Sequence, residues 1–170
     1  MRHAISVADT AAIMAVWEAR WGIPVVTPGG VYHPADVEGL QLLDRDRSTL
    51  ALASWTRSEG GVELVSLDAM VTGRGLGSRI LRAAEEQLAR EGERILRLFT
   101  TGDNVRALSF YLHRGYRLVD VHLDAMEEVR LYKPHLPHFG EGGLPLRDAW
   151  ELHKALGDLV GGVEVSYGRY

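Results

Sequence analysis

One amphipathic segment between two apolar runs constrains the fold more than any other feature of this sequence. The apolar residues between Gly75 and Glu91 share one helical face, and they are Leu76, Ile80, Leu81, Ala84 and Leu88. Gly92 follows at the position of a helix C-terminal cap. The flanking runs, Val62 to Val71 and Ile95 to Thr100, predict strands. A strand, helix and strand in this order predict parallel neighbours joined by a right-handed crossover.

The same alternation extends in both directions along the chain. Asp103 and Asn104 precede a second predicted helix that ends at Gly115, and Tyr116 to His122 predicts a further strand. Upstream we predict a strand at His3 to Ser6, a helix capped by Asp9 that ends near Trp21 to Pro24, a loop at Val25 to Asp36, and strands at Gly39 to Asp44 and Thr49 to Arg57.

The last quarter of the chain has a different composition. Residues 123–147 contain a short charged helical stretch around Glu127 and Glu128, and a stretch from Lys133 to Gly143 too rich in Pro and Gly for regular structure. Asp148 to Leu156 fits both a two-residue and a helical period, and we predict a final strand. We assign no structure to residues 157–170.

Composition excludes several classes of function. The 170 residues are 46% hydrophobic, which suits one domain with a core. A formal net charge of -4 argues against a nucleic-acid partner. The absence of cysteine excludes disulfides, thiolate metal sites and a cysteine nucleophile. No apolar run approaches the roughly 18 residues that span a bilayer, so we expect no membrane partner and a cytoplasmic protein.

A glycine-rich loop stands between the strand predicted at Val62 to Val71 and the strongest helix. Its sequence, Thr72-Gly73-Arg74-Gly75-Leu76-Gly77-Ser78, leaves backbone N–H groups at a helix N-terminus free of bulky side chains, and that arrangement suits an anion. The spacing matches neither the P-loop nor the dinucleotide fingerprint. A tight turn between a strand and a helix, with no ligand, is the alternative interpretation.

A second motif follows at a suitable distance. The segment Asn104 to Tyr116 resembles the Asn-x-x-Ala-x-x-Phe-Tyr-x-x-x-Gly-Phe/Tyr element of the GNAT superfamily of N-acetyltransferases, and residues 73–77 are similar to its Gln/Arg-x-x-Gly-x-Gly/Ala loop. Asp148 to Leu156 is similar to the closing strand of the family. Two positions depart from the pattern, because Thr72 replaces the Gln or Arg and Ala69 replaces a frequent Pro.

The resemblance implies an α/β fold with a mixed central sheet, flanked by helices, in which two parallel strands splay apart. The domain would occupy residues 1–156, with residues 123–147 inserted before the last strand and residues 157–170 as a tail. The implied activity is transfer of an acetyl group from acetyl-CoA to an amine by direct attack in a ternary complex. Acetyl-CoA would be the only cofactor, and we expect no metal.

The same resemblance implies which residues contact acetyl-CoA. The pantetheine arm would lie between the two splayed strands and the diphosphate on the glycine loop. Arg74, Arg79 or Arg114 would supply positive charge, and Asn104 would also cap its helix. The full set of expected cofactor contacts is Leu67, Ala69, Met70, Val71, Gly73, Arg74, Gly75, Leu76, Gly77, Ser78, Arg79, Asn104, Ala107, Phe110 and Arg114.

Two side chains are candidates for the proton transfers. Tyr111 occupies the family position that faces the sulfur, and a phenol is protonated at neutral pH, so we expect it to protonate the thiolate; a core tyrosine is the alternative. Glu63 resembles the strand glutamate that deprotonates the amine through water in the histone acetyltransferase branch, and an exposed edge carboxylate is the alternative. Asp68 is a second candidate base.

The acceptor is less constrained by the sequence. We expect a small-molecule or peptide amine near Trp21, Tyr32, His33 and the 133–143 stretch, with His135 or His138 contributing to recognition. A homodimer is compatible with the sequence. Two other functions stay open: an acyl-CoA-binding module that senses the cofactor without turnover, and a plain α/β domain whose loop binds only an anion.

Overall fold

The computed structural model describes residues 3–157, so residues 158–170 of the expected tail lie outside the described residues. The strands are β1 (Ala4–Val7), β2 (Val25–Thr27), β3 (Gly30–Tyr32), β4 (Glu38–Leu43), β5 (Thr49–Ser58), β6 (Gly61–Ala69), β7 (Ile95–Thr101), β8 (Arg117–His122) and β9 (Ala149–Ala155). The helices are α1 (Thr10–Arg20), α2 (Leu76–Arg90), α3 (Val105–Leu112), α4 (Ala125–Tyr132) and the one-turn helices η1 (Pro34–Asp36) and η2 (Glu141–Gly143).

Seven of these strands form one mixed sheet in the order β1-β4-β5-β6-β7-β9-β8. Only β6 and β7 pair in parallel, and α2 connects them, as the strand–helix–strand pattern predicts. The final strand at β9 is confirmed. It lies between β7 and β8 and pairs with both in the antiparallel direction. The expected α/β fold with a mixed central sheet is therefore confirmed.

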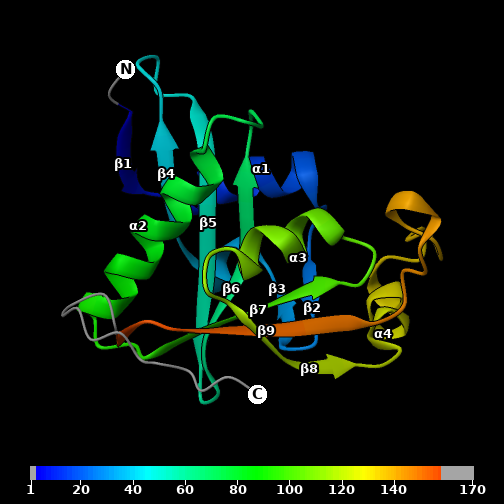
Figure 1. The fold of residues 1–170 in the computed structure, drawn as a ribbon. Coiled ribbons are helices and arrows are strands. Elements are labelled where there is room, and N and C mark those ends of the chain that lie inside the picture. Colours follow the sequence, from blue (N-terminus) through cyan, green and yellow to red (C-terminus); the bar gives the residue numbers. More distant parts are fainter. Residues whose placement is uncertain (1–2, 158–170) are drawn as a thin grey trace.

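Helices cover both faces of the sheet (Figure 1). The apolar stripe of α2 and part of α3, including Tyr111, pack in the main core against β4 to β7 and β9. On the other face α1 buries Ile13, Val16 and Trp17 against Leu52 and Val65. Amphipathic segments thus bury their apolar sides against opposite faces of one sheet.

The prediction of a loop at Val25 to Asp36 is wrong in part. Residues 25–32 form a hairpin in which β2 and β3 pair, with Val25 opposite Tyr32 and Thr27 opposite Gly30. Pro28 and Gly29 form the two-residue connection. The residues interpreted as signs of an irregular loop are also the residues that close a tight hairpin.

The parallel pairing of β6 with β7 is short, and the two strands separate beyond it. Only three residue pairs connect them, the last being Leu64 with Leu98, although β6 continues to Ala69 and β7 to Thr101. The pairing ends beside an irregularity on β6, where Ser66 and Leu64 pair with consecutive residues of β5 and leave Val65 as a bulge. A bulge bends its strand and increases the local twist, which accounts for the separation at this point.

The bulge also changes which side chains share a face of β6. Val65 packs in the cluster formed by α1, and the next residue, Ser66, accepts a hydrogen bond from Trp17 Nε1 at 2.9 Å. Two consecutive residues therefore face α1, which a regular strand does not allow. As a result Leu67 and Ala69 return to the α2 face and pack against the main core.

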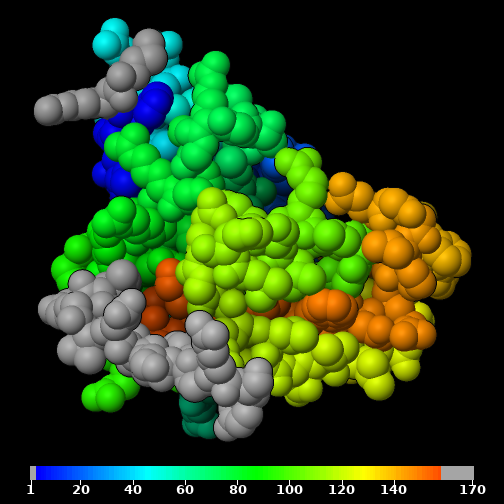
Figure 2. All heavy atoms as spheres, in the orientation of Figure 1, coloured from blue at the N-terminus to red at the C-terminus, as the bar shows by residue number. Residues whose placement is uncertain are grey.

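The segment before β9 is more ordered than its composition indicates. The charged helical stretch is confirmed as α4, whose Met126 and Val129 form a small core with Leu146 and Ala149. In Figure 2 the segment that follows α4, coloured orange, projects at the side of the molecule beside α3. None of the helices between residues 3 and 157 has the length and apolar character needed to cross a bilayer.

We expect Asp9→Ala to lower the free energy of unfolding by about 1 kcal/mol, because the Asp9 carboxylate accepts a hydrogen bond from the Ala12 N–H at 2.8 Å and caps α1. Urea unfolding monitored by circular dichroism measures the difference. Asp9→Ser keeps a capping oxygen and serves as the control. Equal stability of the alanine variant and the wild type would contradict the assignment of the cap.

Candidate functional site

The N–H groups at the start of α2 are free to bind a ligand. Between residues 3 and 157, no N–H group of residues 72–78 donates to a carbonyl or a side chain. Gly73 and Gly75 have φ angles of 76° and 69°, a backbone conformation that favours glycine and turns the chain into the helix. The positive end of the helix dipole and these unpaired donors form a site suited to an anion.

A groove of about 350 Å³ extends from this loop between β6 and α3. Seven of the sequence-predicted cofactor or catalytic residues line it: Leu67, Ala69, Gly77, Asn104, Ala107, Phe110 and Tyr111. Thr72, the position that departs from the family pattern, also lines it. Three lining residues were not predicted from the sequence: Arg20, Arg106 and Glu141. They come from α1, α3 and η2, and no local motif connects them to the loop.

The exposed backbone of β6 faces this groove. Met70 N–H donates to Leu50 O at 2.9 Å, and the antiparallel register continues through Asp68 with Leu52. Alternate residues of a strand direct their N–H groups to opposite sides, so the N–H groups of Leu67 and Ala69 face away from β5. They face the side on which β7 has separated. This gap leaves donors and acceptors for an extended ligand.

Three arginines were expected near the phosphates, and the structure distinguishes among them. Arg114 stacks on Phe110, with its guanidinium carbon 3.6 Å from the ring centroid, and donates to Ser78 Oγ in the first turn of α2. Arg74 is exposed on the glycine loop. Arg79 instead donates to the carbonyl of His3 at 2.9 Å and is committed to the N-terminal segment. Positive charge at the loop therefore comes from Arg74 and Arg114.

Three other expected contacts do not line the groove with their side chains. Met70 packs against the α1 cluster, and its N–H is used by Leu50. Leu76 is buried in the main core, so only its N–H faces the loop. Val71 is exposed beyond the end of β6. The sequence alone did not show that the side chains of these three residues would point away from the groove.

Tyr111 is buried in α3 with its hydroxyl unused. Its ring makes edge contacts with Phe110 and Tyr116, at centroid distances of 5.2 and 5.3 Å, and the residue is 9% exposed. It lines the groove, and no hydrogen bond from its hydroxyl to another described residue exists. Burial, with a smaller contribution from the Asp68 charge, raises the pKa of Tyr111. The phenol is therefore fully protonated at neutral pH.

Glu63 is a buried carboxylate on the α1 face of β6, not an exposed edge residue. It accepts hydrogen bonds from Thr27 Oγ1 at 2.6 Å and Tyr32 OH at 2.9 Å, and Arg97 lies 3.7 Å away. Burial raises the pKa of Glu63, while the two hydrogen bonds and Arg97 lower it in part. Burial and the Glu63 charge in turn raise the pKa of Tyr32 to about 12.

Asp68 is also buried, nearer to the groove. Trp21 Nε1 donates to its carboxylate at 3.0 Å, and Arg20 Nε lies 3.3 Å from Oδ1. Burial raises the pKa of Asp68, and these partners oppose the shift. It lines a hollow of about 460 Å³ together with Arg20, Trp21, Leu67 and Asn104, so it remains a second candidate base.

Another hollow, of about 390 Å³, opens between the β2–β3 hairpin, β7 and α4. Arg20 and Asn104 line both this hollow and the groove, so the two spaces meet at the gap between β6 and β7. We call it the acceptor hollow. Trp21 lines it, as expected from the sequence. His135 and His138 are exposed and do not line it. Tyr32 instead donates a hydrogen bond to Glu63, and His33 caps η1.

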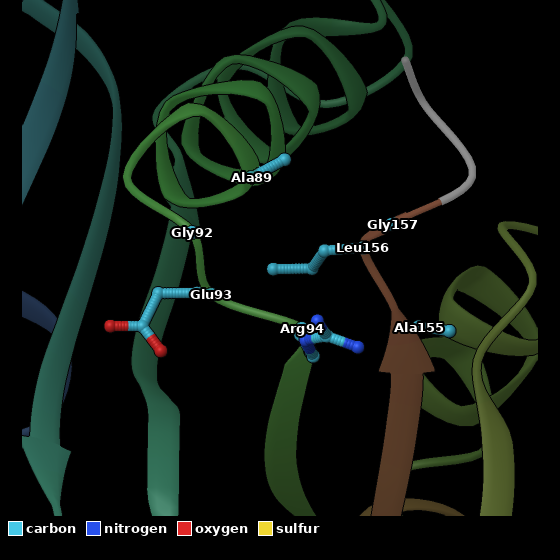
Figure 3. Close-up of a pocket in the computed structure, with 7 residues that line it drawn as sticks. All are labelled: Ala89, Gly92, Glu93, Arg94, Ala155, Leu156 and Gly157. Carbon is cyan, nitrogen blue, oxygen red and sulfur yellow. The ribbon is translucent and has the colours of Figure 1, made fainter. Parts of the chain in front are cut away.

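Two other features lie outside these spaces. Asp120, His122 and Glu151 bring possible metal-binding atoms within 4.8 Å of one another on β8 and β9, a cluster that the sequence did not reveal because it depends on strand pairing. Glu151 is already held by hydrogen bonds with His122 and His153. A further hollow, shown in Figure 3, lies at the C-terminal end of α2 and borders Gly157.

Comparison with known proteins agrees with this geometry. The model of the acetyltransferase (GNAT) family matches residues 41–116, which include β6, the glycine loop, α2 and α3. The uncharacterized protein YxbD of Bacillus subtilis (strain 168) is 33% identical over 145 residues, which cover 85% of this chain and 91% of YxbD.

Solved structures share the fold. An IAA acetyltransferase from Bacillus cereus ATCC 14579 superposes with a TM-score of 0.70 and 17% identity, covering 91% of this chain and 99% of that one. A Bacillus subtilis acetyltransferase in complex with CoA gives a TM-score of 0.67 and 14% identity over the same shares of the two chains. The sequence motifs, the separated parallel strands and these matches together show that the chain belongs to the GNAT family of acetyltransferases.

Proposed function

We propose that this protein is an N-acetyltransferase that moves the acetyl group of acetyl-CoA to an amine by direct attack in a ternary complex. The observation that supports this most strongly is the continuity of three features: the unpaired N–H groups of residues 72–78, the groove along the free edge of β6, and the acceptor hollow that meets it. The related Bacillus subtilis fold was solved with CoA, which supports acetyl-CoA as the co-substrate.

The diphosphate of acetyl-CoA would bind the glycine loop. The N–H groups of Gly73 to Ser78 supply donors, and Arg74 and Arg114 supply charge, which offsets the loss of the family's Gln or Arg at Thr72. The pantetheine arm would extend along β6 beside Leu67 and Ala69, with Ala107 and Phe110 opposite. Gly77 has no side chain and Ala107 has only a methyl group, so both leave room in the groove for an extended chain.

The reaction requires a donor for the thioester oxygen, an acid and a base. The Leu67 N–H, which faces the gap, would polarise the thioester carbonyl. Tyr111 would donate a proton to the departing thiolate, since its hydroxyl is protonated and lines the groove. The incoming amine must lose a proton, because an alkyl ammonium has a pKa of about 10.4 and is not a nucleophile.

Glu63 would accept that proton indirectly. Thr27 lines the acceptor hollow and donates its hydroxyl hydrogen to Glu63 at 2.6 Å, so a proton can pass from the amine to the carboxylate through this hydroxyl or a water. Because burial raises the pKa of Glu63, its basic form appears at a higher pH than that of an ordinary glutamate. The rate is then expected to rise with pH through this elevated pKa.

Glu63→Gln should therefore lower kcat about tenfold to a hundredfold and remove the acidic limb of the pH–rate profile. Steady-state rates between pH 5 and 9 measure both effects. Asp68→Asn is the matched comparison. If the glutamine variant keeps the limb and the asparagine variant loses it, the base is Asp68 and not Glu63.

An assay of free CoA release from acetyl-CoA tests the proposed function. We expect release to depend on an added amine across a panel of amino acids, arylamines, polyamines and peptides, with mass spectrometry showing the acetylated product. CoA binding with no amine-dependent release would instead support a sensing module. No binding of CoA would leave only the interpretation of a plain α/β domain.

A further inference from the structure

The lining of the acceptor hollow restricts the kind of amine it admits. Most of its side chains are apolar, from all the elements around it: Val25 and Val26 of the hairpin, Val65 and Phe99 of the sheet, Met126 and Val129 of α4, and Leu136 and Leu146 after it. At about 390 Å³ the hollow is at the small end of the range for small-molecule sites. It suits a compact apolar body.

The two cations of this lining, Arg20 and Lys133, lie in one corner. Lys133 Nζ donates to the carbonyl of Trp21 at 2.7 Å, which ties Lys133 to the residue next to Arg20. Both cations line the hollow, and Arg20 also lines the groove where the two spaces meet. The positive corner is therefore at the end of the hollow where acetyl transfer would occur.

One of these two cations already has a carboxylate partner and the other does not. Arg20 contacts Asp68 through Nε, while the carbonyl of Trp21 is the hydrogen-bond partner of Lys133 and no carboxylate between residues 3 and 157 pairs with it. Burial lowers the pKa of Lys133, and a nearby anion would offset that desolvation. The only acidic residue of the lining is Asp103, whose Oδ2 accepts from Glu141 N–H and whose Oδ1 is buried with no hydrogen-bond partner among the described residues.

We infer that the acceptor is an α-amino acid with an apolar side chain. This assignment rests on the proposed function and specifies its substrate. An α-amino acid carries its amine and carboxylate on one carbon, so the amine reaches the gap when the carboxylate contacts Lys133 and Arg20. The apolar side chain then fills the rest of the hollow. A polyamine carries several cations and has no anion to pair with Lys133, so Lys133 would repel it.

Comparing L-leucine with isopentylamine, which lacks the carboxylate, tests the inference. The wild type should prefer leucine in kcat/KM, and Lys133→Met should lower the leucine-to-isopentylamine ratio on the order of tenfold, mainly through KM for leucine. Because the ratio is compared between variants, the different basicity of the two amines cancels. Lys133→Arg should retain the preference, and Arg90→Met, which removes an exposed charge from α2, should leave the ratio unchanged.

The outcomes separate this inference from the proposed function. Equal use of leucine and isopentylamine by the wild type, or an unchanged ratio in Lys133→Met, overturns the amino-acid assignment while acetyl transfer stands. Preference for spermidine also overturns it. If no amine is acetylated although CoA binds, the proposed function itself fails. Thermal unfolding of each variant confirms that a changed ratio is not caused by loss of the fold.

Discussion

Tyr111→Phe is expected to lower kcat about a hundredfold to a thousandfold and to leave the affinity for CoA nearly unchanged. The substitution removes only the hydroxyl, which lines the groove and has no hydrogen-bond partner between residues 3 and 157. The ring keeps its edge contacts with Phe110 and Tyr116. Loss of a positioned general acid typically costs this much in rate. Stopped-flow or steady-state kinetics with isothermal titration of CoA separates turnover from binding.

Tyr116→Phe is the matched control, because Tyr116 is a neighbouring buried tyrosine whose hydroxyl donates to Glu85 at 2.8 Å within the core. It should lose some stability and keep its kcat. A Tyr111→Phe enzyme that turns over at the wild-type rate would remove Tyr111 from the mechanism. A common loss of activity in both variants would indicate damage to the core instead.

Gly77→Leu should weaken CoA binding at least about a hundredfold, or roughly 3 kcal/mol. A Cβ atom at Gly77 would lie 3.8 Å from Ala69 Cβ and from the ring of Phe110, so the side chain fits at its base and then extends into the groove. Leucine has a higher helix propensity than glycine, so α2 should be at least as stable. Isothermal titration and thermal unfolding measure the two effects.

The control for this variant adds the same side chain elsewhere on α2. Arg82 is exposed on the outer side of the helix and does not line the groove, so Arg82→Leu should bind CoA like the wild type. Retained affinity in Gly77→Leu would mean that CoA does not pass between β6 and α3. Together the two variants separate occlusion of the groove from a general effect of leucine on the helix.

Local chemistry explains which parts of the structure the sequence could predict. The apolar stripe of α2, the capping oxygens of Asp9 and Asn104, and the strands that precede the glycine loop and follow α2 depend on neighbours a few residues apart. The two motifs also indicated the groove, because α2 and α3 both begin beside it. Seven of the expected residues consequently line one continuous space.

The remaining features depend on contacts between distant segments. The bulge at Val65 exists only relative to β5, and it determines where β6 leaves β7 and which of its residues face the groove. Arg20 and Lys133 are 113 positions apart and line one hollow, where Lys133 Nζ donates to the carbonyl of Trp21, the residue after Arg20. Thr27 and Tyr32, the hydrogen-bond partners of Glu63, belong to a hairpin that the sequence indicated as a loop.

The central claim is that backbone N–H groups of the glycine loop bind the diphosphate of CoA. Amide ¹H–¹⁵N spectra recorded during a titration with CoA test it directly. We expect the signals of Gly73, Gly75 and Gly77 to shift in a saturable manner, while those of Gly61, at the start of β6, and Gly92, at the far end of α2, stay in place. Saturable CoA binding that leaves the signals of Gly73, Gly75 and Gly77 unshifted would contradict the claim.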